Sequence, residues 1–224
     1  MADSVSWAPD SATGSNTSNP KALVYVIDDD EAVLQSLMAL IESHGLEVRG
    51  YTQASKFLAE YDGQSHGCIV TDWRMPEVPG MQLLDELKKR GMPSPVIVLT
   101  AFADVPMAVG AMRTGAVTVL QKPCPDAELF AAIHQALEAD LINRRQNRQK
   151  EDIKRRIERL SDGEREVMNL ALSGRMNREI ASQLGIGLRT VEKRRHNVMQ
   201  KMQVESLAEL MQVMMMVEAS SYPY

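Results

Sequence analysis

The chain has 224 residues, of which 44% are hydrophobic and 25% charged, and its formal net charge is −5. This composition is ordinary for a soluble globular protein and excludes a collagen-like, a disulfide-scaffolded or a wholly disordered chain. The length favours two domains, and the acidic net charge argues against a protein that coats nucleic acid through bulk charge alone.

The cysteines and the hydropathy pattern bear on the cellular compartment. Cys68 and Cys124 alone build neither a disulfide framework nor a cysteine-based zinc site, and they fit a reducing environment. The sequence has no run of 18 apolar residues, and its N-terminus lacks the basic and then apolar regions of a signal peptide. We therefore expect a cytoplasmic protein without a membrane partner.

An α/β domain is predicted after a disordered tail at residues 1–20, where small polar residues dominate. From 21 to 125, short apolar runs alternate with helical patterns. The runs of strand length are Ala22–Ile27, Val48–Tyr51, Cys68–Thr71, Val96–Thr100 and Val117–Leu120. Continuous apolar strands are typical of parallel sheets that are covered by helices on both faces. The pattern predicts a flavodoxin-like, doubly wound, five-stranded parallel sheet.

A long helix is predicted for 126–160, which contain neither Gly nor Pro. It would begin as the last helix of the α/β domain and continue as a linker. A repeat at every fourth residue is formed by Leu129, Ile133, Leu137 and Leu141, and a polar stretch with four basic residues follows at 143–150. If continuous, the helix would be about 50 Å long at 1.5 Å per residue. The linker is either a solvated helical spacer or part of a two-chain coiled coil. The apolar repeat is too interrupted to decide between these two predictions.

The second predicted domain, 161–217, is all-α and has four helices, and 218–224 form a second tail. Ser161 and Glu164 make a capping-box pattern at the start of its first helix. The second helix ends near Gly185, and a short turn leads to a third helix from about 188 to 202. Two helices joined in this way are a helix-turn-helix pattern.

Acidic residues stand at the carboxyl ends of two predicted strands. Asp28, Asp29 and Asp30 end the first strand, and Asp72 ends the third. Ligands bind beyond the carboxyl ends of parallel strands, so Asp28, Asp29 and Asp72 converge if these strands are neighbours. Carboxylates about 4 Å apart repel by ~4 kcal/mol per pair at an effective dielectric of 20, so the cluster needs a proton or a cation, and magnesium suits it. Asp30 reads equally well as a helix cap.

Two more strand ends contribute Thr100 and Lys122, the latter before a proline whose peptide bond can be cis. A hydroxyl, an ammonium, a carboxylate and a metal at one rim are the parts that hold a phosphoryl group. Here the sequence resembles the receiver domain of bacterial two-component response regulators, and its FixJ branch in particular. The motifs that carry this resemblance are Val26–Asp30, Asp72–Pro76, Gly80, Leu99–Ala101, Asp104–Val109 and Lys122–Pro123.

The receiver resemblance covers about residues 21–140. It implies that Asp72 accepts a phosphoryl group from a sensor histidine kinase, and that Thr100 and Lys122 contact the phosphoryl oxygens. The implied magnesium ligands are the carboxylates of Asp29 and Asp72, Asp28 through water, and the backbone carbonyl of Arg74.

Two positions depart from the receiver pattern. Val119 stands at the switch position, where receivers usually have an aromatic residue that turns inward on activation, and Cys124 replaces the usual Phe. A receiver that signals without phosphorylation therefore stays open. A magnesium-dependent phosphatase with an Asp nucleophile is a second alternative, although Asp72–Arg74 lacks the second Asp of the haloacid-dehalogenase motif.

The predicted third helix of the second domain has a basic face opposite an apolar stripe, which fits the major groove of double-stranded DNA. Residues 160–210 resemble the LuxR/NarL-type helix-turn-helix, through Leu160–Ser161, Glu164–Val167, Asn177–Ala181, Leu184–Ile186 and Arg189–Glu192. The resemblance implies recognition positions at Glu192, Lys193 and His196. The full set of predicted DNA contacts is Arg178, Arg189, Thr190, Glu192, Lys193, Arg195 and His196.

Together these features predict a DNA-binding response regulator that is controlled by aspartyl phosphorylation. We expect a homodimer when Asp72 is phosphorylated, and a contact with RNA polymerase stays open. We expect no enzymatic activity beyond single-turnover phosphoryl acceptance and self-dephosphorylation.

Overall fold

The computed structural model describes residues 22–92, 94–102 and 104–218, so the predicted N-terminal tail and residues 219–224 lie outside the described residues. The chain divides into two compact units after Leu141, and each is considered by itself below. None of the described helices is long and apolar enough to span a bilayer.

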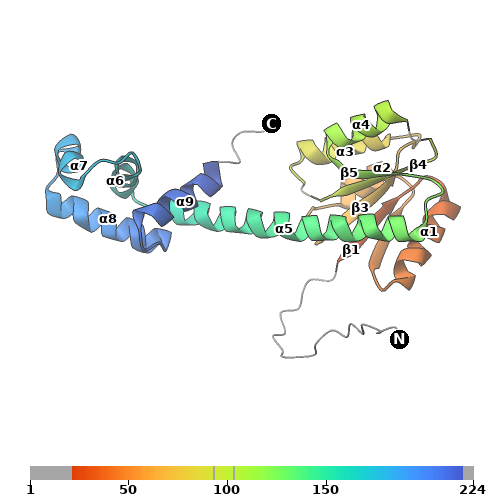
Figure 1. Ribbon diagram of the computed structural model, residues 1–224, viewed down its shortest axis with the longest axis horizontal. Coiled ribbons are helices and arrows are strands. Elements are labelled where there is room, and N and C mark those ends of the chain that lie inside the picture. Colours follow the sequence, from red (N-terminus) through yellow and green to blue (C-terminus); the bar gives the residue numbers. More distant parts are fainter. Residues whose placement is uncertain (1–21, 93, 103, 219–224) are drawn as a thin grey trace, which may run out of the picture. The chain divides into compact units, whose positions relative to one another are not determined.

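The first unit is built on a five-stranded sheet (Figure 1). Its strands are β1 (Leu23–Ile27), β2 (Glu47–Tyr51), β3 (Gly67–Asp72), β4 (Val96–Thr100) and β5 (Ala116–Gln121). All neighbouring pairs are parallel, and the order is β2-β1-β3-β4-β5. The predicted parallel sheet is therefore confirmed. Because β1 pairs directly with β3, the strand ends that carry Asp28 and Asp72 are adjacent, as the predicted site requires.

Helices cover both faces of the sheet, as expected for strands that are buried on both sides. They are α1 (Glu31–Ser43), α2 (Ala54–Glu60), α3 (Gly80–Lys89), α4 (Val105–Thr114) and α5 (Asp126–Glu158). Val24 and Val26 of β1 pack with α1 and α5, whereas Tyr25 and Ile27 pack with α2, α3 and α4. The helix α2 had not been predicted, because its seven residues carry no clear apolar period.

The second unit contains α6 (Asp162–Leu172), α7 (Asn177–Leu184), α8 (Leu188–Met202) and α9 (Leu207–Glu218). The predicted capping box is present: Ser161 accepts a hydrogen bond from the backbone of Glu164, whose carboxylate accepts one from the backbone of Ser161. Gly185, whose backbone is in the left-handed region, ends α7. Gly187 is the N-cap of α8 and offers no side-chain hydrogen bond to it. This is the predicted helix-turn-helix.

Glu164 joins α6 to α8. Its carboxylate is 6% exposed and accepts hydrogen bonds from Lys201 Nζ at 2.6 Å and Asn197 Nδ2 at 3.0 Å. The hydrogen bond from Lys201 is the main reason why the pKa of Glu164 falls to about 2, and the bond from the Ser161 backbone adds to it against the effect of burial. A charged Glu164 therefore stabilises the pairing of these two helices.

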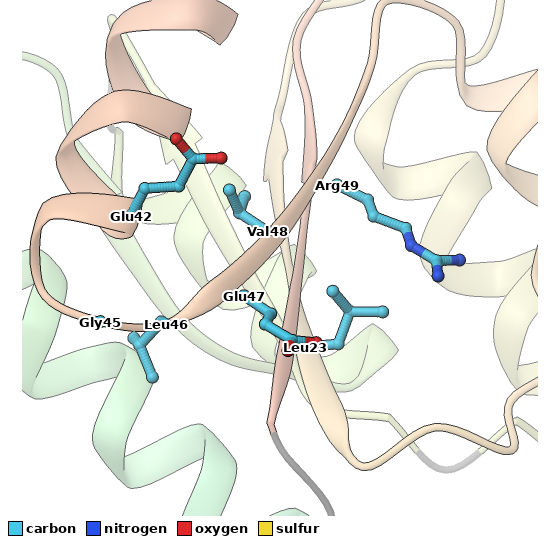
Figure 2. Close-up of a pocket in the computed structure, with 7 residues that line it drawn as sticks. All are labelled: Leu23, Glu42, Gly45, Leu46, Glu47, Val48 and Arg49. Atoms are coloured by element: carbon cyan, nitrogen blue, oxygen red, sulfur yellow. The ribbon is translucent and has the colours of Figure 1, made fainter.

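A hollow of about 460 Å³ opens at the amino ends of β1 and β2 (Figure 2). Its lining residues are Leu23, Glu42, Gly45, Leu46, Glu47, Val48 and Arg49. It lies at the opposite end of β1 from Asp28, so it takes no part in the acidic site.

We expect Glu164→Gln to destabilise the second unit at neutral pH by about 1–3 kcal/mol, because it weakens charge-assisted hydrogen bonds. The pKa of Glu164 is lowered in the fold, so its stabilisation is complete above about pH 4.5 and is lost as the pH falls toward 2. Hydrogen exchange of α6 and α8 peptides between pH 7 and about pH 2 measures both effects. The exposed Glu166→Gln is the matched control, and equal protection in both variants would contradict the assignment.

Candidate functional site

Three strand ends bring Asp28, Asp72 and Lys122 together. The Lys122 ammonium donates hydrogen bonds to Asp28 Oδ2 and Asp72 Oδ1, each at 2.6 Å. Asp28 directly follows β1, Asp72 ends β3, and Lys122 directly follows β5 at a cis Lys122–Pro123 bond. The parallel order of the sheet therefore gathers at one edge residues that lie as far as 94 positions apart.

Burial and charge act against each other in this cluster. The side chains of Asp28, Asp72 and Lys122 are 4%, 13% and 23% exposed. Burial raises the pKa of Asp28, and the hydrogen bond from Lys122 only partly offsets this. Burial also disfavours the Lys122 ammonium, but its hydrogen bonds to the two carboxylates outweigh that effect and raise its pKa. The lysine thus stays charged between two carboxylates that would otherwise repel each other.

The other two acidic residues after β1 have different environments. Asp30 is the N-cap of α1 and accepts hydrogen bonds from the backbone N–H groups of Ala32 and Val33, at 2.9 and 3.2 Å. Asp29 is exposed. In the part of the chain that the structure describes, no three His, Cys, Asp or Glu side chains form a metal-binding group, so the expected convergence is limited to Asp28 and Asp72.

Thr100 and Arg74 flank the acceptor position. The backbone N–H of Arg74 donates to Asp72 Oδ2 at 2.6 Å, and the Thr100 hydroxyl donates to the carbonyl of Phe102 at 3.2 Å. The Arg74 guanidinium lies 5.0 Å above the ring centre of Phe102, whose side chain is 67% exposed. Sequence reasoning had missed Phe102, although an aromatic residue two positions after Thr100, next to a predicted site residue, could have indicated it. A cavity of about 410 Å³ beside them is lined by Arg74, Phe102, Asp104 and Gln121.

In the second unit, α8 presents most of the predicted DNA-binding residues to solvent. The exposed members of the set are Arg178, Arg189, Thr190, Glu192, Lys193 and His196. Arg195 differs, because it is half-buried and donates to Asn177 Oδ1 at 2.6 Å. It therefore joins α8 to the start of α7, a contact that sequence reasoning had missed. Val191 and Val198 form the buried stripe of α8, as predicted.

Comparisons with known proteins agree with this architecture. Residues 24–134 match the response regulator receiver domain, and residues 158–214 match the luxR family of bacterial regulatory proteins. The transcriptional regulatory protein FixJ of Azorhizobium caulinodans is 46% identical over 87% of this chain and 92% of its own length. The response regulator protein TodT of Pseudomonas putida is 37% identical over 88% of this chain and 86% of its own length.

Two solved structures extend the likeness across both units. The response regulator StyR superposes with a TM-score of 0.76 and 37% identity, covering 90% of this chain and all of StyR. Full-length FixJ from B. japonicum gives a TM-score of 0.55 at 40% identity, covering 89% of this chain and 98% of that one. The chain belongs to the FixJ-type response regulators. It is a two-component transcription regulator, with a receiver followed by a LuxR-type DNA-binding domain.

Within this FixJ-type receiver, the two departures from the usual motif lie on opposite faces of the sheet. Val119 on β5 is half-buried and packs against the core formed with α2, α3 and α4. Cys124 is half-buried and packs against the core formed with α1 and α5.

We expect Lys122→Ala to lower the free energy of unfolding of the receiver by about 2–3 kcal/mol without magnesium, because it leaves two carboxylates without their shared donor. Millimolar magnesium should recover part of this loss, since a cation then supplies the missing charge. Urea unfolding followed by tryptophan fluorescence, with and without magnesium, measures both effects. Lys56→Ala on the exposed surface of α2 is the control. Equal destabilisation at all magnesium concentrations would speak against the cluster as the cation site.

Proposed function

We propose that Asp72 is the phosphoryl acceptor of this regulator and that a sensor histidine kinase is the donor. The observation that supports this is the pair of 2.6 Å hydrogen bonds by which Lys122 holds Asp72 beside Asp28. Asp72 is also the more exposed of the two carboxylates, at 13% against 4%, so an incoming phosphoryl group reaches it first.

Magnesium fits the donors at this edge. The proposed ligands are the carboxylates of Asp29 and Asp72 and the backbone carbonyl of Arg74, with Asp28 bound through a water. All are hard oxygens of the kind that Mg²⁺ takes together with several waters. When bound, the cation neutralises charge on the phosphoryl oxygens during transfer. The Lys122 ammonium supplies part of that neutralisation within the chain itself, because it already lies between two of the proposed ligands.

Three residues of the chain have separate roles in phosphoryl transfer: Asp72, Lys122 and Thr100. A carboxylate oxygen of Asp72 attacks phosphorus, and the phosphohistidine nitrogen of the kinase leaves with the bonding electron pair. Lys122 turns from the carboxylates toward the new phosphoryl oxygens. The Thr100 hydroxyl exchanges its hydrogen bond to the Phe102 carbonyl for one to the phosphoryl group. Because Thr100 ends β4 and Lys122 directly follows β5, their movement alters the surface near α4, through which a phosphorylated homodimer would form.

We further propose that the exposed face of α8 enters the major groove of DNA. Lys193 and Arg189 supply positive charge for phosphates and guanines, whereas Glu192 can accept a hydrogen bond from cytosine. In a dimer, two such helices would read half-sites about 34–36 Å apart, or a multiple of this distance.

A receiver that signals without phosphorylation is the second candidate, and Val119 favours it because the usual aromatic switch is absent. The two candidates differ in one observable property. Only the first requires that DNA affinity depends on a phosphodonor. The phosphatase alternative has no support from the family matches.

Asp72→Asn should abolish phosphorylation, because an amide is not a nucleophile toward phosphorus and is a weaker magnesium ligand. The full chain would be incubated with acetyl phosphate and magnesium, and the modified fraction read on a phosphate-affinity gel. Asp85→Asn, which changes an exposed carboxylate on α3, should be modified as the wild type is. A shifted band that persists in Asp72→Asn would refute the assignment.

Replacing Lys193 and His196 together by Ala should weaken DNA binding more than tenfold, because both side chains lie on the exposed face of α8. If Lys193 contacts a phosphate, the slope of log K against log salt should also fall by about 0.9. Titration of a duplex selected from a random pool measures both effects. Lys154→Ala removes an exposed charge from α5 and serves as the control. Unchanged affinity with helical content preserved would place the recognition face elsewhere.

A further inference from the structure

A buried histidine–carboxylate pair lies at the opposite end of β3 from Asp72. His66 Nδ1 lies 2.7 Å from Asp140 Oδ2, and the backbone N–H of Gly67 donates to the same oxygen at 3.0 Å. His66 is 6% exposed and Asp140 is fully buried. The phosphorylation chemistry proposed above uses neither residue.

Asp140 marks the place where α5 leaves its packing on the receiver. The buried residues that precede it on this helix all pack in the core formed with α1: Leu129, Phe130, Ala132, Ile133, Ala136 and Leu137. After Asp140, every residue from 141 to 152 is half-buried or exposed, and the next buried one is Ile153 in the second unit. The contact between His66 and Asp140 therefore lies at the last turn of α5 that packs on the receiver.

The contact also restricts how α5 can rotate. A buried carboxylate that loses its partner is strongly destabilising, so Asp140 must stay opposite His66 and the Gly67 amide. Each residue of an α-helix turns by about 100°, so a slip of one position would carry Asp140 away from both donors. The backbone around Gly67 is also tightly packed, because a Cβ at Gly67 would lie 1.9 Å from the carbonyl oxygen of Leu23.

We propose that His66 and Asp140 are a positioning pair that fixes the rotation of α5 where it leaves the receiver, and that phosphorylation alters DNA binding only while this contact holds. The proposal rests on the proposed function, since it assumes that Asp72 is the acceptor. The strand β3 carries Asp72 at its end and supplies the Gly67 amide at its start, with His66 just before it. The strand thus connects the acceptor to the base of the linker.

The test measures coupling rather than activity. Full-length Asp140→Asn and His66→Gln would be phosphorylated with acetyl phosphate and magnesium, and the DNA affinity of each would be measured with and without the phosphodonor. We expect Asp72 to be modified as in the wild type, and the ratio of the two affinities to fall at least fivefold. Hydrogen exchange across residues 141–152 should accelerate. Glu138→Gln and His134→Gln change exposed residues of the same helix and should leave the ratio unchanged.

An affinity ratio that stays at the wild-type value in both variants would overturn the proposal, whatever their stability. If a variant does not fold, exchange in the wild-type protein still decides. Protection along α5 should drop just after Asp140, and strong protection that continues evenly to Ile153 would contradict a support that ends at this pair. If wild-type Asp72 takes no phosphoryl group, the proposed function fails, and the exchange measurement then tests the pair by itself.

Discussion

The rest of the receiver depends on two hydrogen bonds that the Lys122 ammonium donates, one to Asp28 and one to Asp72, each at 2.6 Å. Asp28 follows β1 and Asp72 ends the neighbouring parallel strand β3, and burial together with repulsion from Asp72 raises the pKa of Asp28. Lys122, which directly follows β5, supplies a positive charge to both carboxylates and holds Asp72 in place as a nucleophile. The same ammonium is the group that an arriving phosphoryl dianion would attract, so the contact that stabilises the resting state also makes it responsive.

The second unit uses a similar pair for a different purpose. Glu164 accepts a hydrogen bond from Lys201, just as Asp28 accepts one from Lys122. Glu164 has additional donors that complete its hydrogen bonding, and its pKa falls to about 2, whereas the pKa of Asp28 is raised. The first arrangement is a fixed joint between two helices. At Asp28, by contrast, burial outweighs the hydrogen bonds from Lys122 and from the backbone of Asp30, so its pKa is raised. This difference fits a structural role for Glu164 and a switching role for the site around Asp28.

Much of this could be predicted from the sequence. The apolar runs gave the strands, and the strand-end residues Asp72, Thr100 and Lys122 are local signals. The short helix α2, the stack of Arg74 on Phe102 and the bond from Arg195 to Asn177 were missed, since each depends on contacts that local patterns do not encode. Asp140 was also missed, because only the three-dimensional fold shows that a carboxylate in a polar-looking helix is fully buried beside His66.

The central claim is that Lys122 changes partners when a phosphoryl group reaches Asp72. A crystal structure of the full chain with magnesium and beryllium trifluoride, a stable mimic of the aspartyl phosphate, tests this most directly. We expect Lys122 Nζ to contact a fluorine atom and to lie beyond hydrogen-bond distance, about 3.2 Å, from Asp28. A structure in which the mimic is bound to Asp72 while Lys122 still bridges both carboxylates would contradict it.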